Sequence, residues 1–220
     1  MERRVLFTDR ETVVLEEYDR FGGPLAADEV EGHTVCSLIS AGTEINGTYY
    51  DTQGWGNYPR GSGYAAVFRV ERVGADVTAC RAGDLVMGWH QHQSFQRVRE
   101  KDIVVLPKGI DPKAAPFARM SAVPAASLAR ITLRPGAWPI VVVGLGNVGI
   151  MAMQLYAALG YEVVGTDIDP KRAEVAAKVT GLPAFAGLGG EYDDYFGAAL
   201  ECSGTQQGTL ECCRLLRPEG

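Results

Sequence analysis

Three glycines follow a run of β-branched residues at a spacing that suits the binding of phosphate. Gly144, Gly146 and Gly149 stand in G-x-G-x-x-G order directly after residues 140–143, which are Ile-Val-Val-Val. In such a turn the first glycine permits the bend, the second lets the backbone approach a pyrophosphate, and the third lets helix and strand pack closely. A helix that starts near Asn147 would point its unpaired N–H groups at the phosphates. The spacing therefore predicts a dinucleotide site at this turn.

An acidic residue, Asp167, ends the next predicted strand, residues 162–166. An acid at that place accepts hydrogen bonds from an adenosine ribose and repels a 2′-phosphate, so it favours NAD over NADP. A tight turn without a ligand, or a site for S-adenosylmethionine, would show the same glycines. The order of strand, glycines, helix, second strand and acid favours the dinucleotide.

Composition and charge exclude several classes of partner. The chain has 220 residues, of which 46% are hydrophobic and 22% charged, and its formal net charge is −6. An acidic protein of this kind is not expected to bind nucleic acid or an anionic membrane surface. No apolar run approaches the length of a membrane span, and the first residues do not form a signal peptide. We therefore expect a cytoplasmic protein.

The five cysteines are odd in number, scattered, and contain no C-x-x-C pair. This pattern predicts free thiols in a reducing compartment rather than disulfides or a structural metal site.

The first half of the chain consists of short β-type segments separated by turn residues. Such a pattern, without helices, predicts a small and strongly bent β domain. The expected strands are residues 5–8, 12–16, 34–39, 63–73, 85–87, 95–98 and 103–106. Residues 45–61 have no clean period and predict a loop whose aromatic residues shape a substrate pocket: Tyr49, Tyr50, Trp55 and Tyr58.

The second half changes to helical and then alternating patterns. Asp111 begins an alanine-rich stretch in which Pro116 and Pro124 predict two short helices. We expect three regions: a β domain over 1–110, a helical link over 111–135, and a Rossmann domain over 136–220. After Asp167 the pattern predicts a helix over 170–180, strands over 183–185 and 198–202, and a helix over 205–216. That makes four parallel strands where a doubly wound dinucleotide sheet usually holds about six, so we expect the Rossmann domain to be incomplete.

Four groups of residues carry a resemblance to a known family. They are Gly63-Tyr64 with Val67, Val70 and Val73-Gly74; Gly83-Asp84-x-Val86; the 144–149 glycine turn; and Glu201-Cys202-Ser203-Gly204. In these marks the chain resembles the medium-chain dehydrogenase/reductase family, and residues 40–44 (SAGTE) are similar to an alcohol dehydrogenase-like branch. The resemblance implies an α/β protein with an N-terminal bent β-barrel-like (GroES-like) domain that carries substrate residues, followed by a doubly wound Rossmann domain for NAD(P).

The resemblance also indicates where a catalytic zinc would be held, and those positions differ here. Zinc-dependent members use a cysteine, a His-Glu pair and a later cysteine. This sequence has Ser40 or Ala41 at the first position, Tyr64-Ala65 at the pair, and only Ser121 in the later region. Because tight zinc binding needs thiolate or imidazole ligands, we expect no metal.

Without zinc, a carbonyl must be polarised by hydrogen-bond donors. Thr43 matches the family hydroxyl that contacts the reacting oxygen, although a turn-capping role would suit it equally. Glu44 matches the acid beside it, with a structural partner role as the alternative. His92 is a candidate general acid or base, and otherwise a histidine of a surface loop. Tyr64 is a further possible donor.

For the cofactor, the resemblance implies that NAD contacts the glycine turn, the acid after the second strand and its neighbours, and a serine after the fourth strand. These residues are Gly144, Gly146, Asn147, Val148, Gly149, Asp167, Ile168, Arg172 and Ser203.

Three functions follow as hypotheses. The first is an NAD-dependent, zinc-independent oxidoreductase that moves hydride between nicotinamide and a carbonyl or alcohol carbon of a small molecule. The second is an NADPH-linked enone or quinone reductase of the same family, against which Asp167 argues. The third is a non-catalytic nucleotide-binding module or fragment. For the full-length protein, the resemblance implies a homo-oligomer.

Overall fold

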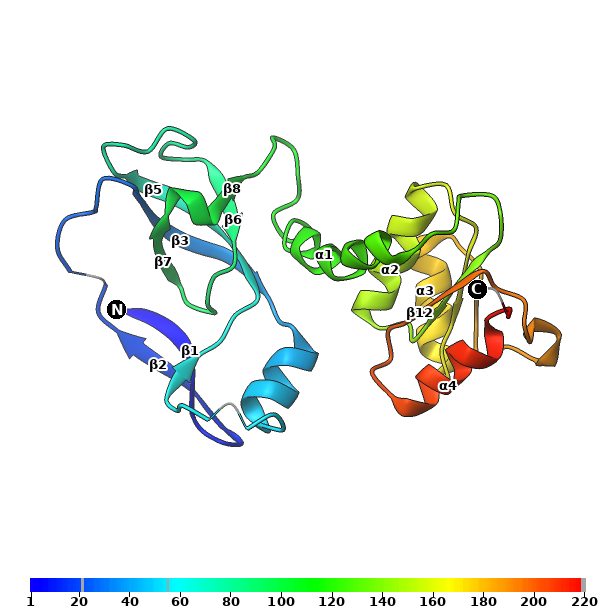
Figure 1. Ribbon diagram of the computed structural model, residues 1–220. Coiled ribbons are helices and arrows are strands. Elements are labelled where there is room, and N and C mark those ends of the chain that lie inside the picture. Colours follow the sequence, from blue (N-terminus) through cyan, green and yellow to red (C-terminus); the bar gives the residue numbers. More distant parts are fainter. Residues whose placement is uncertain (21, 55, 219–220) are drawn as a thin grey trace. The chain divides into compact units, whose positions relative to one another are not determined.

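The chain divides into two compact units, Met1–Arg119 and Met120–Gly220 (Figure 1). The computed structural model describes residues 1–20, 22–54 and 56–218, so Trp55, one of the aromatic residues expected at the substrate pocket, lies outside the described residues. The boundary between the units falls inside helix α1 (Phe117–Ser127). The division into a β domain, a link and a Rossmann domain at residues 110 and 135 stays a prediction.

The N-terminal unit is built from two antiparallel sheets. One has the strand order β2-β1-β4 and the other β7-β3-β5-β6-β8. The long strand β5 buries Phe68 and Val70, which pack with Val30 and Val86 into one apolar cluster. Its strands are β1 (Glu2–Asp9), β2 (Thr12–Tyr18), β3 (Glu29–Leu38), β4 (Arg60–Gly61), β5 (Ala65–Val73), β6 (Leu85–Gly88), β7 (Phe95–Arg99) and β8 (Ile103–Val105), with a 3₁₀ turn, η2 (Glu100–Asp102). The bent β domain predicted from the sequence is confirmed.

The segment between β3 and β4 is not wholly a loop. A π-helix, η1 (Gly42–Tyr49), occupies its first part. The Tyr50 N–H donates to the carbonyl of Ile45, five residues earlier, at 2.8 Å. The loop prediction for residues 45–61 was therefore wrong over 45–49, and also over 60–61, which form β4 and pair with β1. A helix this short depends on contacts with the rest of the fold, and the sequence shows no apolar period for it. One such contact is the hydrogen bond that the Glu11 N–H donates to the Tyr49 carbonyl at 2.8 Å.

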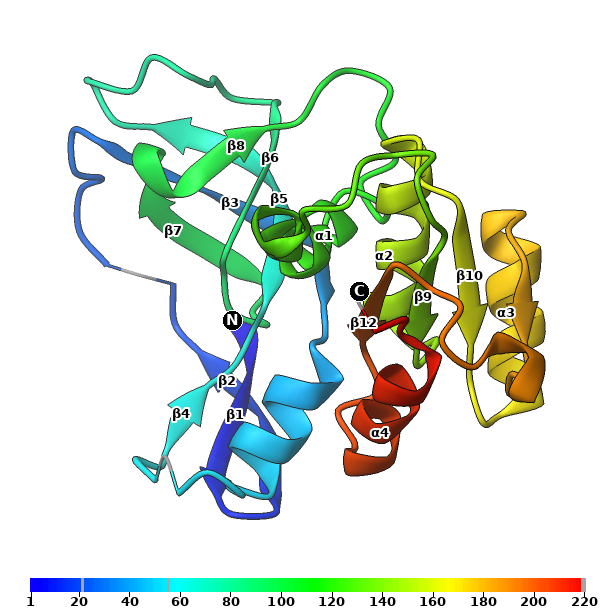
Figure 2. The ribbon, with the colours of Figure 1, turned by 45° about the vertical axis from the view of Figure 1, so that its right-hand side comes forward.

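The C-terminal unit holds a parallel sheet in the order β11-β10-β9-β12 (Figure 2). In chain order this is third, second, first, fourth, which is how a doubly wound dinucleotide sheet begins. The elements are η3 (Leu128–Arg130), β9 (Ile140–Val143), α2 (Asn147–Ala158), β10 (Val163–Thr166), α3 (Pro170–Thr180), β11 (Ala184–Phe185), η4 (Gly190–Tyr192), β12 (Ala198–Glu201) and α4 (Gln206–Leu215). The predicted order of strands and helices is confirmed.

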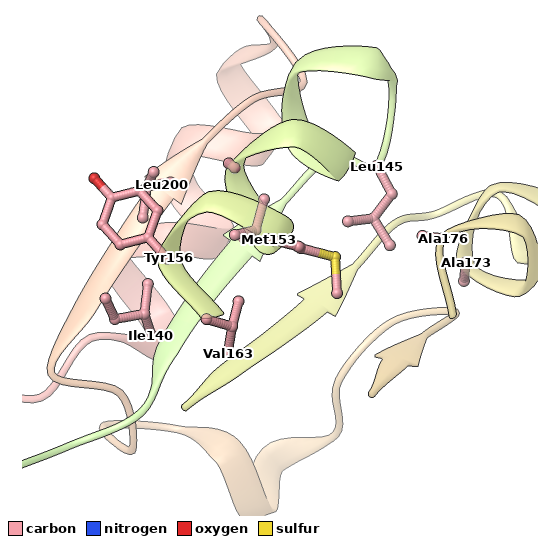
Figure 3. Close-up of a cluster of buried hydrophobic side chains, with 10 residues drawn as sticks. Ile140, Leu145, Met153, Tyr156, Val163, Ala173, Ala176 and Leu200 are labelled. Carbon is pink, nitrogen blue, oxygen red and sulfur yellow. The ribbon is translucent and has the colours of Figure 1, made fainter. Parts of the chain in front are cut away.

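Strand β9 explains why helices cover both faces of this sheet. Its four side chains are all buried, and successive side chains of a strand point to opposite faces. Ile140 and Val142 pack in a cluster with α2 and α3, including Met153 and Tyr156 (Figure 3). The alternate residues of the strand pack in a second cluster with Leu215 of α4.

One helix prediction was wrong. Pro124 does not divide the alanine-rich stretch, because α1 runs from Phe117 to Ser127 with Pro124 inside it. Pro116 directly precedes the helix, where a missing N–H costs nothing. Among the described residues, no helix is long and apolar enough to span a membrane.

Candidate functional site

Two of the three motif glycines serve the fold of the turn. Gly144 has a φ of +94°, and a Cβ there would lie 2.5 Å from the Ser203 backbone nitrogen. A Cβ on Gly149 would lie 2.0 Å from the Gly144 carbonyl oxygen. Both positions therefore exclude any larger residue, as expected for a bend and for close packing of helix on strand.

Gly146 is different, because no described part of the chain requires it to be glycine. Its φ is −74°, and no atom of the described residues lies within 4 Å of the place a Cβ would take. It is the N-cap of α2, and no side chain caps that helix. The first-turn N–H groups of Asn147, Val148 and Gly149 have no helical acceptor behind them. Open space beside unpaired donors fits the pyrophosphate of a dinucleotide.

The side chain of Asp167 joins the glycine turn to the end of β10 by hydrogen bonds. Its side chain is 6% exposed. The Leu145 N–H donates to Oδ2 at 2.7 Å, and the Asp169 N–H donates to Oδ1 at 2.9 Å. Each carboxylate oxygen accepts more than one hydrogen bond, so both still have capacity for ribose hydroxyls. The sequence suggested that Asp167 binds the ribose, but it gave no sign that Asp167 also accepts a hydrogen bond from the glycine turn.

A cleft of about 280 Å³, the Asp167 cleft, lies at the carboxyl ends of β9 and β10. Five residues predicted for the cofactor line it: Gly144, Asp167, Ile168, Arg172 and Ser203. Ile168 is 95% exposed, so it presents an apolar side chain that no protein group covers. Residues of α4 and its cap complete the wall and were missed by the sequence: Thr205, Gln207, Gly208 and Glu211. Their position directly after β12, at the ligand-binding edge of a parallel sheet, was the available signal.

The N-terminal unit has a cavity of its own of about 550 Å³, the Thr43 cavity. It is lined by Thr43, Glu44, Thr48, Arg60, Gly61, Ser62, Gly63, Tyr64, Trp89, His90 and Gln91. Thr43 is exposed, and the Ser40 hydroxyl lies 3.3 Å from its own. Three of the residues proposed from the sequence, Thr43, Glu44 and Tyr64, are thus brought together, whereas His92 is not part of this wall.

His92 reaches the Thr43 cavity only through Glu44. Its Nε2 lies 2.8 Å from Glu44 Oε2, and its Nδ1 lies 2.8 Å from the Ser37 hydroxyl. The His92 side chain is only 9% exposed, and it faces another cavity of about 540 Å³ lined mainly by apolar residues. Both residues were proposed from the sequence, but their contact with each other and the contact of His92 with Ser37 were not, because His92 lies far from both in the sequence.

Glu44 is held as a carboxylate by several donors. The Ser62 hydroxyl donates to Oε2 at 2.6 Å, and the Ser40 N–H donates to Oε1 at 2.7 Å. Burial by itself would raise the pKa of Glu44, but the hydrogen bonds from His92, Ser62 and the Ser40 amide outweigh it and lower that pKa. The arrangement fixes the backbone just before Thr43.

Comparisons with known proteins give relatives of one kind. A quinone oxidoreductase of Pseudomonas aeruginosa is 32% identical over 126 residues, which are 54% of this chain and 38% of that protein. An L-galactonate-5-dehydrogenase of Escherichia coli is 29% identical over 160 residues, 64% of this chain and 47% of that protein. The aldehyde reductase AdhA of Synechocystis is 30% identical over 193 residues, 72% of this chain and 56% of that protein.

The chain belongs to the medium-chain dehydrogenase/reductase family. It spans about half the length of the curated relatives it matches. No protein-family model matches it.

Solved structures show the same fold as this medium-chain dehydrogenase/reductase. Galactitol-1-phosphate dehydrogenase from Escherichia coli superposes with a TM-score of 0.79 at 18% identity, covering 98% of this chain and 72% of that one. Escherichia coli quinone oxidoreductase complexed with NADPH superposes with a TM-score of 0.64 at 22% identity, covering 80% and 56%. The GroES-like and Rossmann architecture expected from the sequence is confirmed.

The predicted lack of metal in this family member stays a prediction. Within residues 1–20, 22–54 and 56–218, no three His, Cys, Asp or Glu side chains are grouped to hold a metal ion. Burial raises the pKa of Cys202 to about 11 and that of Cys212 to about 12. Burial thus favours the neutral thiol form of both cysteines.

Proposed function

We propose that this medium-chain dehydrogenase/reductase is an NAD-dependent oxidoreductase that transfers hydride between nicotinamide and a carbonyl or alcohol carbon without a catalytic zinc. The observation that carries the proposal is the uncapped first turn of α2 beside the open face of Gly146, with Asp167 braced onto the same turn. The dehydrogenase and reductase names of the relatives support it.

The residues of the C-terminal unit fit the cofactor. NAD, when bound, supplies the hydride acceptor or donor. The first-turn amides of α2 hold the pyrophosphate, Asp167 accepts hydrogen bonds from the ribose diol, and Ile168 covers the adenine. Ser203 lines the same cleft beside Gly144.

The preference for NAD rests on charge. Asp167 is a buried acid at the position where NADP would place a 2′-phosphate, so the like charges would repel each other. Arg172 lines the same cleft, and its Nε lies 4.0 Å from Asp169 Oδ2. Asp167 would thus meet the ribose, whereas Arg172 lies next to another acid, Asp169, at the rim of the cleft.

Thr43 is the proposed donor to the reacting oxygen, because its hydroxyl is exposed in the Thr43 cavity. Glu44 and His92, predicted from the sequence as catalytic residues, are proposed as positioning residues. Glu44 holds the Ser40 amide next to Thr43, and His92 holds Glu44 from the opposite side at 2.8 Å. Loss of either partner would move the segment that carries Thr43.

A second candidate is an NADPH-linked reductase of enones or quinones. It is favoured by the relative named quinone oxidoreductase and by the position of Arg172 on the cleft, where a 2′-phosphate would meet it.

Within the first proposal, the protein acts on a small molecule in the cytoplasm, and the full-length protein is a homo-oligomer.

Turnover assays separate these functions. Purified protein is offered alcohols with NAD⁺ and aldehydes or ketones with NADH, and in parallel enones and quinones with NADPH. The first proposal predicts faster turnover with the alcohol and carbonyl pairs. Faster turnover of enones or quinones with NADPH would overturn it in favour of the second candidate. Cofactor binding without any turnover would favour a nucleotide-binding module.

A further inference from the structure

The guanidinium of Arg119 is fixed by two aromatic rings at the edge of the Thr43 cavity. Its Cζ lies 5.0 Å from the ring centroid of Tyr64 and 4.8 Å from that of Trp89. Both rings line the Thr43 cavity. Stacking of this kind holds an arginine in place through cation–π attraction, worth about 0.5–2 kcal/mol.

Among the residues that the structure describes, Arg119 has no acidic partner, in contrast to Arg97 and Arg99. Arg97 is paired with Glu31 at 2.7 Å, and Arg99 lies 3.8 Å from Asp28. No described carboxylate lies within 4.0 Å of Arg119. A guanidinium that stacks on aromatic faces keeps the N–H donors at its edge for other acceptors. The residue thus offers a positioned, unneutralised fork of donors.

Arg119 also lines a cavity of about 760 Å³, the Arg119 cavity, which shares Trp89 and His90 with the Thr43 cavity. Lys101 lines it as well, with Arg97 and Arg99. Two acids face the same space, Glu29 and Asp102, but the Glu29 carboxylate already accepts from the Ala26 N–H at 2.9 Å. The side chains that line this wall are four basic and two acidic ones, so their formal charges sum to a positive value, although Arg97 and Arg99 are paired with acids outside the wall.

The exposure of Trp89 indicates that this wall is a binding surface and not only part of the packed interior. Its side chain is 68% exposed although it contacts Arg119, and its Nε1 donates to the Gly63 carbonyl at 3.2 Å. A large aromatic ring that is fixed in position and exposed beside a cation is typical of a binding surface.

We propose that the substrate carries an anionic group, a carboxylate or a phosphate, that Arg119 binds in the Arg119 cavity while its reacting carbon lies in the Thr43 cavity. Because the two cavities share a wall at Trp89 and His90, one small molecule spans both. The planar guanidinium forms two parallel hydrogen bonds with either anion. This inference rests on the proposed oxidoreductase function.

Matched substrates test it. Benzaldehyde is compared with 4-carboxybenzaldehyde, and glyceraldehyde with glyceraldehyde 3-phosphate, so that the two arms separate carboxylate from phosphate. The wild type should favour at least one anionic member. Arg119→Gln should raise KM for that member about 10- to 100-fold, the loss of a charge-assisted hydrogen bond, and should raise KM for the neutral member far less. Arg119→Lys should restore part of the preference.

The control is Arg81→Gln, which removes an exposed arginine of the same unit that lines neither cavity. It should leave the preference for the anion intact. Equal KM for neutral and anionic members in the wild type, with no change in Arg119→Gln, would overturn the inference while the turnover itself upholds the oxidoreductase.

A binding measurement makes the two proposals separable. Tryptophan fluorescence of the whole protein is titrated with benzoate and with inorganic phosphate, and Trp89 should report binding because it contacts Arg119. Saturable binding that Arg119→Gln abolishes, without turnover of any substrate, would retain the anion site and reject the oxidoreductase. No response that depends on Arg119 would reject the anion site.

Discussion

The two units of the chain bury polar groups in very different numbers. The buried polar and charged residues of the N-terminal unit include Glu2, Glu31, Glu44, Thr48, Ser62, His90 and Gln96, whereas those of the C-terminal unit are, within the described residues, Thr166 and Asp167. The Rossmann unit is held by apolar faces at regular spacing. The β unit depends in addition on hydrogen-bonded carboxylates that join distant strands.

The difference shows which information is local in the sequence. In the Rossmann unit, β9 is buried on both faces and its alternate residues meet α2 on one side and α4 on the other. In the β unit, Glu31 meets Arg72 and Arg97, which are far from it in the chain. A buried carboxylate is stable only when its partners are present.

The largest expected effect is in the β unit. Glu31 is 3% exposed and accepts from Arg72 Nε at 2.5 Å and from Arg97 Nε at 2.8 Å. Glu31→Ala leaves the charge of Arg97 buried without its acid, so unfolding free energy should fall by about 3–5 kcal/mol. Chemical denaturation measures this fall.

The matched control is Glu17→Ala. Glu17 lies 3.4 Å from Arg3, and both side chains are more than half exposed. Its loss should cost less than about 1 kcal/mol, the usual value of a surface pair. Equal effects of the two changes would contradict the view that carboxylate networks hold the β unit.

The second prediction compares the loss of stability when each of two glycines of the motif is changed to alanine. Gly149→Ala places a Cβ 2.0 Å from the Gly144 carbonyl oxygen, so it should destabilise the Rossmann unit by about 3 kcal/mol. Gly146→Ala meets no described protein atom, so it should cost less than about 1 kcal/mol, the loss of a favourable N-cap residue, and should weaken binding of NADH. A loss of stability in Gly146→Ala equal to that in Gly149→Ala would show that the open face belongs to the fold.

The third effect is a dependence on pH. The Ser94 hydroxyl, opposed by burial and helped by Arg20 and His33, lowers the pKa of Glu2 from 4.5 to about 2. A lowered folded-state pKa stabilises the fold fully above the unfolded value, and this stabilisation is lost as pH falls through the folded value. Glu2→Gln should therefore cost about 1–3 kcal/mol at pH 7, and the gap to the wild type should narrow between pH 4.5 and 2.

Urea denaturation of both proteins at pH 7, 4 and 2.5 measures that gap. A difference that stays constant over this range would mean that the charge of Glu2 does not contribute to stability.

The sequence predicted the Rossmann unit and brought forward five residues that line the Asp167 cleft, because the signals are local. The spacing of Gly144, Gly146 and Gly149, the burial of residues 140–143 and the acid at 167 lie within one short stretch. The helix across Pro124 was missed because tertiary packing overrode its helix-breaking tendency.

The Thr43 cavity was predicted less completely, since its geometry comes from pairings across the fold. Thr43 and Glu44 were proposed through the resemblance, but the separation of His92 into another cavity has no signal in the sequence. The same is true of Arg119, whose partners Tyr64 and Trp89 lie on other segments.

Titration of the purified protein with NADH and with NADPH, for the wild type and for Asp167→Asn, tests the central claim most directly. Asn removes the charge and keeps one acceptor oxygen, so it can accept from the Leu145 or the Asp169 amide but not from both. That loss acts on both cofactors alike, and the ratio of their affinities therefore reports the charge. The wild type should bind NADH more tightly. In Asp167→Asn the ratio of NADH to NADPH affinity should fall about 10- to 100-fold, which corresponds to about 1–3 kcal/mol. Tighter binding of NADPH by the wild type, or an unchanged ratio in Asp167→Asn, would contradict the assignment of Asp167 as the residue that selects NAD.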